Sequence, residues 1–338
     1  MSYINETLTN LQDFVTKLDA FLTGTPGWTQ DQLNTGSGQA AWHKSGADDD
    51  VYVSVRWDTS SPNFLGLYHA LGYTGGNVPG NHPDDSGNGA VSGTDATIGG
   101  QRRQPITNTP VQYWAFEDDD YCHVVIETSV GVYTHMGFGV LDKIGDWTGG
   151  AYAYAWRHTT GVNTGVAVLT GTSVLLDGLL KDTTSPSLTN AEEHAATIHC
   201  EGLANQSGSG KWAVHMGNQS SANLGTDRAA VARLHFVGGF RAGPIAFPLG
   251  RFAATSQKAL TPMYALGTFH WDRSTGDVYG PLGYMKDVRG ISIKNYAPGD
   301  EIVVGGDTWV VFPSRAKYSS SLTNTSAYQG IAYRKVTT

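Results

Sequence analysis

Residues 130–141 read VGVYTHMGFGVL, and their side chains alternate between two different faces. Every second residue from Val130 to Val140 is apolar except for one threonine, which is the pattern of a strand with a buried side. The other face carries glycine at three positions, around Tyr133 and His135. Because glycine weakens a strand, we expect it here to let another backbone or a large ring approach closely. The stretch therefore predicts a strand in a sheet that is covered on both faces.

The glycine-bearing face admits two interpretations. In the first, Gly137 and Gly139 are covered by this chain or by a neighbouring subunit, and Tyr133 and Phe138 are packing residues. In the second, Tyr133 and His135 form the floor of a catalytic site. No nucleophile or metal ligand is signalled for His135, and an isolated histidine on a strand is usually structural. The packing interpretation is therefore favoured.

Strand signals continue through most of the chain. Short runs rich in Val, Ile and Tyr, bounded by Gly, Asp, Asn and Thr, recur from Val51 to Phe312. The runs EIVV and DTWVVF are joined by Gly305 and Gly306, which supply the positive φ angles of a tight hairpin. The pattern predicts a mainly β fold of sandwich-like antiparallel sheets.

The N-terminal residues 1–24 show helical periodicity instead. Apolar residues from Ile4 to Leu22 are spaced four, three, four, three and four apart, and Gly24 and Pro26 form a stop signal. The predicted amphipathic helix lies on its own domain, or else joins a short bundle around a symmetry axis. Its candidate packing or interface residues are Leu8, Leu11, Val15 and Leu18.

Two polar segments interrupt the strand pattern. Residues 74–110 have no periodicity, which predicts a functional loop, an arm that becomes ordered on contact, or disorder. Residues 182–190, DTTSPSLTN, have the composition of a linker. They suggest two β lobes, one at 27–181 and one at 190–338 that contains the C-terminal hairpin.

Composition bears on the partners of the protein. Of 338 residues, 15% are charged and 43 are glycine, against about 25% charged and about 7% glycine in ordinary domains. A surface with few solvating groups favours cover by partner subunits, so we expect a homo-oligomer. The net charge of −8 argues against nucleic acid as a partner. No apolar run approaches the length of a spanning helix, and the start MSYINETLTN lacks the features of a signal peptide.

One loop has the spacing of a calcium site. Asp84, Ser86, Asn88 and Asp95 occupy the first, third, fifth and twelfth positions of a loop like that of an EF-hand, with Gly89 at the sixth. Against this interpretation, serine replaces one carboxylate, aspartate replaces the bidentate glutamate, and no helices flank the loop. An ordinary solvated loop is the alternative, and no other cofactor is expected.

The familiar catalytic motifs are incomplete. The segment SGSGKW at 207–212 lacks the first glycine and the final Ser or Thr of a phosphate-binding loop, and no GxSxG sequence occurs. His194 and His199 lie close together but not in the order of a zinc motif. The acidic runs at 48–50 and 117–120 each precede a strand, where we expect turns. Enzymatic activity is therefore not expected.

Three segments are similar to parts of a known class of protein: GVYTHMGFGVLDKIGDWTGGAYAYAWRH at 131–158, GDEIVVGGDTWVVFPSR at 299–315 and YQGIAYRKV at 328–336. They resemble virion structural proteins encoded among the tail genes of tailed bacteriophages. In such proteins a phrase like LDKxGxWTGG follows a strand, and a tight hairpin precedes a Trp-x-Val-Phe-Pro run. The matching residues here are Leu141, Asp142, Lys143, Gly145, Trp147, Thr148, Gly149, Gly150, Trp309, Val311, Phe312 and Pro313.

The resemblance implies a non-enzymatic component of the tail or baseplate. Such a protein is present in several symmetric copies, contacts other virion proteins and is assembled in the host cytoplasm. Phe138, Trp147 and Trp309 are then candidate packing anchors. Two alternatives stay open: a module that binds host-surface carbohydrate through exposed aromatic residues, and a head decoration protein.

Overall fold

The protein is built almost entirely from strands. The computed structural model describes residues 2–24, 27–46, 49–59, 64–77, 79, 82–83, 102–105, 109–155, 194–201, 212–216, 263–271, 278–293, 295–313 and 329–336. They include one helix, α1 (Leu11–Gly24). The strands are β1 (Ser2–Thr7), β2 (Thr29–Asn34), β3 (Gln39–Ser45), β4 (Asp50–Asp58), β5 (Phe64–Ala70), β6 (Arg102–Pro105), β7 (Gln112–Asp118), β8 (Tyr121–Ser129), β9 (Val132–Val140), β10 (Asp142–Lys143), β11 (Thr148–Ala155), β12 (His194–Glu201), β13 (Trp212–Met216), β14 (Met263–Trp271), β15 (Val278–Ser292), β16 (Asp300–Val304), β17 (Asp307–Pro313) and β18 (Gln329–Lys335).

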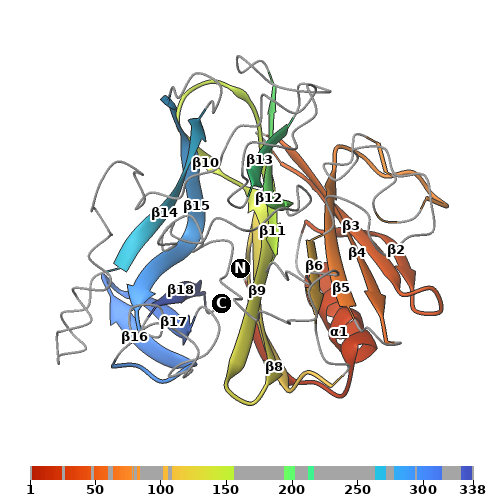
Figure 1. Cartoon of the computed structure of the whole chain (residues 1–338), viewed down its shortest axis with the longest axis horizontal. Coiled ribbons are helices and arrows are strands. Elements are labelled where there is room, and N and C mark those ends of the chain that lie inside the picture. The colour runs from red at the N-terminus through yellow and green to blue at the C-terminus, as the bar shows by residue number, and fades with distance from the viewer. Residues whose placement is uncertain are drawn as a thin grey trace, which may run out of the picture.

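These strands form three antiparallel sheets, so the predicted mainly β, sandwich-like architecture is confirmed. The central sheet has the order β1-β7-β8-β9-β11-β12-β13. The C-terminal sheet has the order β10-β15-β18-β17-β16, with β14 paired to β15, and the N-terminal sheet has the order β2-β3-β4-β5-β6. Figure 1 shows the central sheet between the other two, with the C-terminal sheet in blue on its left and the N-terminal sheet in orange on its right.

Each face of the central sheet packs against a different sheet. On one face, apolar residues of β7, β8, β9 and β11 share a core with α1 and the N-terminal sheet. On the other face, the same strands share a core with the C-terminal sheet. The strand β9 supplies both cores, with Met136 and Phe138 in the first and Tyr133 in the second. Both covers of this strand therefore come from the same chain.

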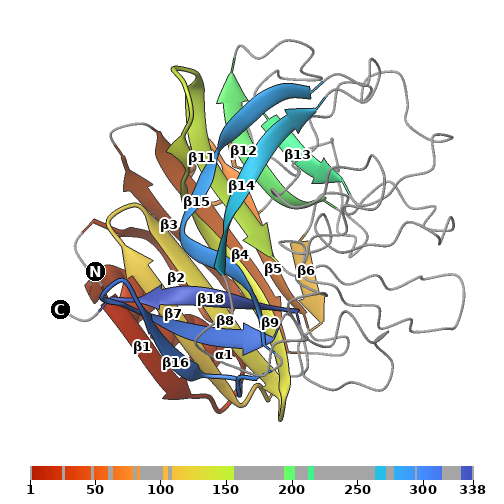
Figure 2. The ribbon, with the colours of Figure 1, turned by 90° about the vertical axis from the view of Figure 1, so that its left-hand side faces the viewer.

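The C-terminal sheet crosses the central sheet rather than continuing it. In Figure 2 it faces the viewer, and β18 crosses in front of the strands β7 to β9. Its strands β16 and β17 form the predicted hairpin, in which Gly305 and Gly306 have φ of 64° and 94°. Two positive φ angles in succession are what a type I′ turn requires.

The N-terminus differs from the helix predicted over residues 1–24. The first residues form β1, which pairs with β7, and α1 begins only after Asn10. The side-chain oxygen of Asn10 accepts a hydrogen bond of 2.8 Å from the backbone N–H of Asp13, an N-cap that fixes the helix start. The apolar spacing extends past this cap because Ile4 and Leu8 pack against the same core as the helix.

The sheets do not follow the boundary that the linker composition suggested. β12 and β13 come after residues 182–190 in the chain but extend the central sheet beside β11. β10 comes before them but pairs with β15 of the C-terminal sheet. The segment 182–190 itself lies outside the described residues, as does most of 74–110. The regions 27–181 and 190–338 thus share two of the three sheets.

Candidate functional site

The glycine-bearing face of β9 is filled by neighbouring groups. A Cβ atom added to Gly137 would lie 2.7 Å from the ring of Tyr154 and 2.7 Å from Nδ1 of His123. One added to Gly139 would lie 2.5 Å from the carbonyl oxygen of Asp120. A large ring therefore occupies the space beside one glycine, and a backbone occupies the space beside the other.

His135 on the same face makes two hydrogen bonds to the C-terminal sheet. Its Nδ1 lies 2.8 Å from the hydroxyl of Tyr333, and its Nε2 lies 2.9 Å from the carbonyl oxygen of Pro313. Because a carbonyl only accepts, Nε2 carries the proton and Nδ1 accepts from the tyrosine. Burial lowers the pKa of His135 to about 4, so the ring is neutral at pH 7. Both ring nitrogens are used in holding two sheets together.

His123 on β8 repeats this arrangement. Its Nδ1 lies 2.9 Å from the hydroxyl of Tyr154, its Nε2 lies 3.1 Å from the carbonyl oxygen of Lys286, and burial lowers its pKa to about 4. The ring of Tyr333 lies 5.6 Å from that of His123 and 5.9 Å from that of His135, between centroids. We call His123, His135, Tyr154 and Tyr333 the His–Tyr layer. It joins the central and C-terminal sheets in their shared interior.

The other candidate packing residues also contact this chain. Phe138 meets the ring of Trp28 edge-on at 5.0 Å between centroids. Trp147 donates its indole N–H to the carbonyl oxygen of Leu282 at 3.2 Å, and Trp309 lies under the guanidinium of Arg289. The helix residues Leu11, Val15 and Leu18 are fully buried in the core that α1 shares with the N-terminal and central sheets. Leu8 is partly buried and packs against the same core.

The predicted calcium ligands are not placed by the structure. Asp84, Ser86, Asn88 and Asp95 lie outside the described residues, so the calcium site stays a prediction. Within the described ranges, no group of three His, Cys, Asp or Glu side chains is arranged to hold a metal ion. No helix in this part of the chain is long and apolar enough to cross a membrane.

The acidic run at 48–50, which was predicted to form a turn, contains Asp49, a residue that connects two sheets. Asp49, just before β4, accepts hydrogen bonds from Nδ1 of His199 at 2.7 Å and from the backbone N–H of Ala151 at 2.8 Å. Burial disfavours the charged form of His199, but the carboxylates of Asp49 and Glu201 raise its pKa above the ordinary value. Sequence reasoning missed this pair because its members are 150 positions apart.

Glu117 on β7 is a buried carboxyl without a good partner. It is 1% exposed, and neither of its oxygens has a hydrogen bond of good geometry among the described residues. Burial raises its pKa to about 7, an effect that the charge of Lys44 partly offsets. The folded pKa lies above the ordinary 4.5, so ionisation of Glu117 opposes folding. The resulting loss of stability grows as pH rises from 4.5 through 7.

Replacing Glu117 with glutamine should stabilise the protein at pH 8. The raised pKa corresponds to at most about 3 kcal/mol, and because the amide also lacks partners we expect a gain of about 2 kcal/mol. Urea unfolding at pH 8 and pH 5 measures it, and the gain should nearly vanish at pH 5. Asp119→Asn, on an exposed turn, is the control and should change little. An equal gain at both pH values would contradict the prediction.

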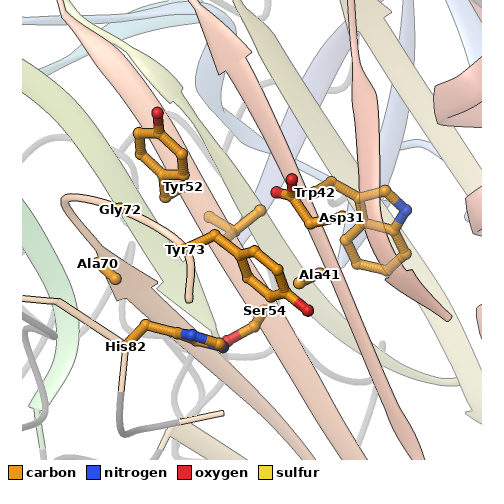
Figure 3. Close-up of a pocket in the computed structure, with 10 residues that line it drawn as sticks. Asp31, Ala41, Trp42, Tyr52, Ser54, Ala70, Gly72, Tyr73 and His82 are labelled. Carbon is orange, nitrogen blue, oxygen red and sulfur yellow. The ribbon is translucent and has the colours of Figure 1, made fainter. Parts of the chain in front are cut away.

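A separate hollow lies on the outer face of the N-terminal sheet, shown in Figure 3. Its cavity volume is about 10 Å³, room for about one water molecule. The strands β2 to β5 and the segment after β5 line it. Its small residues are Ala41, Ala70 and Gly72, and its polar residues are Asp31, Tyr52, Ser54, Tyr73 and His82.

Asp31, at a β-bulge in β2, lines this hollow. The pairing of β2 with β3 shifts register between Gln30 and Gln32, so Asp31 is the extra residue. Gln30 reaches inward and donates to Asp19 of α1 at 2.7 Å. The side chain of Asp31 points to the other face, where it accepts a hydrogen bond of 2.8 Å from Nδ1 of His43. The carboxylate of Asp31 therefore lies on the outer surface of the sheet, opposite the inward Gln30.

His82 closes the other side of the hollow. It is 4% exposed, and its ring lies 4.8 Å from that of Tyr73 between centroids. The backbone N–H of Thr74 donates to its Nδ1 over a long 3.5 Å, while its Nε2 has no partner in the described part of the chain. Burial lowers the pKa of His82 despite the nearby charge of Asp31. The neutral ring therefore carries its proton on Nε2, as an unused donor.

Comparison of the chain with models of known protein families finds no match, and comparison with curated proteins finds no significant similarity.

Proposed function

We propose that this protein is a non-enzymatic structural component of a tailed-phage virion, in the tail or baseplate. The observation that supports this most is that the three segments with the phage-like pattern meet in one place. His135 of segment 131–158 forms hydrogen bonds to Pro313 of segment 299–315 and to Tyr333 of segment 328–336. The resemblance therefore concerns one coherent interface between two sheets rather than three scattered matches.

The packing of the interior agrees with a structural role. The central sheet is covered on both faces by the same chain, and the buried His123 and His135 of the His–Tyr layer form hydrogen bonds to groups of the C-terminal sheet. Such networks fix a single arrangement of the layers. The glycines of β9 serve this packing, and His135 has both ring nitrogens engaged.

The edge of the C-terminal sheet offers a surface for assembly. Among the described strands β16 is the terminal one of this sheet, and its Val303 and Val304 are 72% and 50% exposed. An edge strand presents backbone donors and acceptors, and exposed valines add apolar area to it. In the proposed role this edge contacts a copy of the chain or a neighbouring virion protein, and assembly takes place in the host cytoplasm.

The proposal is tested on phage particles produced in the host. Mass spectrometry of purified particles should detect the chain, and immunogold labelling should place it on the tail. Particles without the chain would refute the virion role, and labelling confined to the head would favour a decoration protein.

The β16 edge has its own test in the same particles. The double substitution Val303→Lys and Val304→Lys should lower incorporation into particles by about tenfold or more, because two buried charges oppose the contact. Val130→Lys, at a valine that is 85% exposed in the turn between β8 and β9, is the matched control. Normal incorporation of the double variant would exclude this edge as an assembly surface.

A further inference from the structure

We infer that the edge strand β1 binds β1 of a second copy of this chain, so that two central sheets join into one. The inference does not rest on the virion role, because it concerns the purified chain, whereas that role is tested in particles. It rests on the direction of the backbone groups of β1, on a self-complementary register, and on an uncovered valine of β16 beside this edge.

β1 presents a row of backbone groups at the edge of the central sheet. Its one partner among the described strands is β7. The backbone N–H of Leu8 donates to the carbonyl oxygen of Val111, directly opposite, at 2.9 Å. Because the backbone groups of successive residues in a strand point to alternate sides, those of Tyr3, Asn5 and Thr7 point away from β7.

A lysine limits which of these groups a second strand can use. The ammonium of Lys17 on α1 donates to the carbonyl oxygen of Thr7 at 2.7 Å and lies 3.2 Å from the carboxylate of Asp13. Charged side chains at sheet edges commonly restrict strand pairing. Within the described part of the chain, the outward groups left for a second strand are those of Tyr3 and Asn5.

These groups select one antiparallel register between two copies. Tyr3 of each copy pairs with Asn5 of the other, and the two Ile4 residues face each other on the two-fold axis. Glu6 then lies opposite Ser2 of the other copy, so like charges do not meet. A shift by one pair would place Ile4 opposite Glu6 and would use the backbone carbonyl that the lysine already binds. The strand is therefore complementary to itself, as a two-fold interface requires.

The strand β16 lies beside this edge. The ammonium of Lys335 is 4.7 Å from the ring centroid of Tyr3 and 2.7 Å from the carboxylate of Glu301, and Figure 2 shows β1 and β16 together at the lower left. Val310, opposite Glu301 in the hairpin, belongs to the core shared with the central sheet. Glu301 and Val303 therefore lie on the face of β16 that is turned toward that sheet, yet Val303 is 72% exposed.

A second copy provides the cover that Val303 lacks. The described central sheet ends at β1, and a strand added beside β1 continues that sheet on the side where β16 lies. Burial of an apolar side chain favours association. The core between the central and C-terminal sheets thus continues across the two-fold axis.

Sedimentation equilibrium of the purified full chain at about 1–100 µM tests the inference. The unmodified protein should be dimeric in the upper part of this range. Asn5→Pro removes an outward N–H from an edge strand, where proline is tolerated, and should weaken the dimer by about tenfold or more. An unmodified chain that stays monomeric throughout would overturn the inference.

A disulfide trap tests the register. Two residues that face each other in a non-hydrogen-bonded antiparallel pair have Cα atoms about 4.5 Å apart, which a disulfide can span. Ile4→Cys should therefore give a covalent dimer under mild oxidation. Thr7→Cys, at an exposed position of the same strand that does not face its own copy, is the control and should give little. A dimer that Ile4→Cys does not trap would contradict the pairing.

β16 offers a matched pair of variants for the same measurement. Val303→Lys should weaken the dimer by about tenfold or more, because it places a charge where the dimer buries an apolar side chain. Val304 is 50% exposed on the opposite face of the strand, so Val304→Lys should leave the dimer unchanged. Melting temperatures identify variants that fail to fold, and the disulfide trap replaces any such variant. The inference is overturned if folded Asn5→Pro and Val303→Lys both dimerise like the unmodified protein.

Discussion

Gly137→Ala should destabilise the fold by about 3 kcal/mol, although it adds a single methyl group. In the ladder of the central sheet, Gly137 lies between His123 on β8 and Tyr154 on β11. The hydrogen bond of 2.9 Å between these two side chains passes over the glycine, and a Cβ would lie 2.7 Å from both. Overpacking costs about 1–3 kcal/mol, and loss of a buried hydrogen bond adds about 1–3 kcal/mol.

Urea unfolding of matched variants measures this effect. Gly75→Ala is the control, because a Cβ there meets nothing within 4 Å, and its effect should stay below about 0.5 kcal/mol. In a Tyr154→Leu background the cost of Gly137→Ala should fall, because the colliding ring is gone. The same cost in both backgrounds would show that the ring is not the cause.

The two faces of β9 show which features of the structure the sequence pattern can predict. Alternation predicted which side chains lie on which face, and the glycines predicted a close neighbour. The partners of His135 on the same face were not predictable, because Tyr333 and Pro313 lie about two hundred positions away in the chain. Local patterns carry no information on such distant partners. Both the assignment of two lobes and the missed His199–Asp49 pair have this cause.

The hollow shows a second limit of sequence reasoning. Asp31 lies at a bulge that adds one residue to β2, and nothing in the run TQDQLN marks that register shift. His82 lies in a polar segment whose composition predicted a loop but no contact. The abundance of tyrosine and tryptophan suggested carbohydrate binding in general terms. Only the fold brings Asp31, Tyr73 and His82 to one place.

The protein should also lose stability on mild acidification, by about 3 kcal/mol between pH 7 and pH 4. His123 and His135 are fully buried, with pKa values of about 4 against an ordinary 6.5. Between about pH 6.5 and pH 4 these two histidines are protonated in the unfolded chain but neutral in the folded one. The free energy of unfolding therefore falls as the pH is lowered through this range. Each histidine alone would remove about 3 kcal/mol, about 6 kcal/mol together, and opposing groups reduce the net loss to about 3 kcal/mol.

Two other groups act in the opposite direction. The pKa of Glu117, raised to about 7, favours the folded state by up to about 3 kcal/mol on acidification. His199, whose pKa is raised by Asp49 and Glu201, also favours the folded state at lower pH. The two buried histidines outweigh them, because each has a shift as large as that of Glu117 and both act together.

Unfolding free energies at pH 7 and pH 4 in three variants separate these contributions. His135→Gln should be less stable at pH 7, because it loses ideal hydrogen bonds to Tyr333 and Pro313, but the difference between the two pH values should shrink by about 3 kcal/mol. His123→Gln should behave in the same way. In Glu117→Gln the difference should grow instead, because the opposing carboxyl is gone. If both histidine variants keep the full pH dependence of the unmodified protein, protonation of the His–Tyr layer is not the cause of the loss of stability at pH 4.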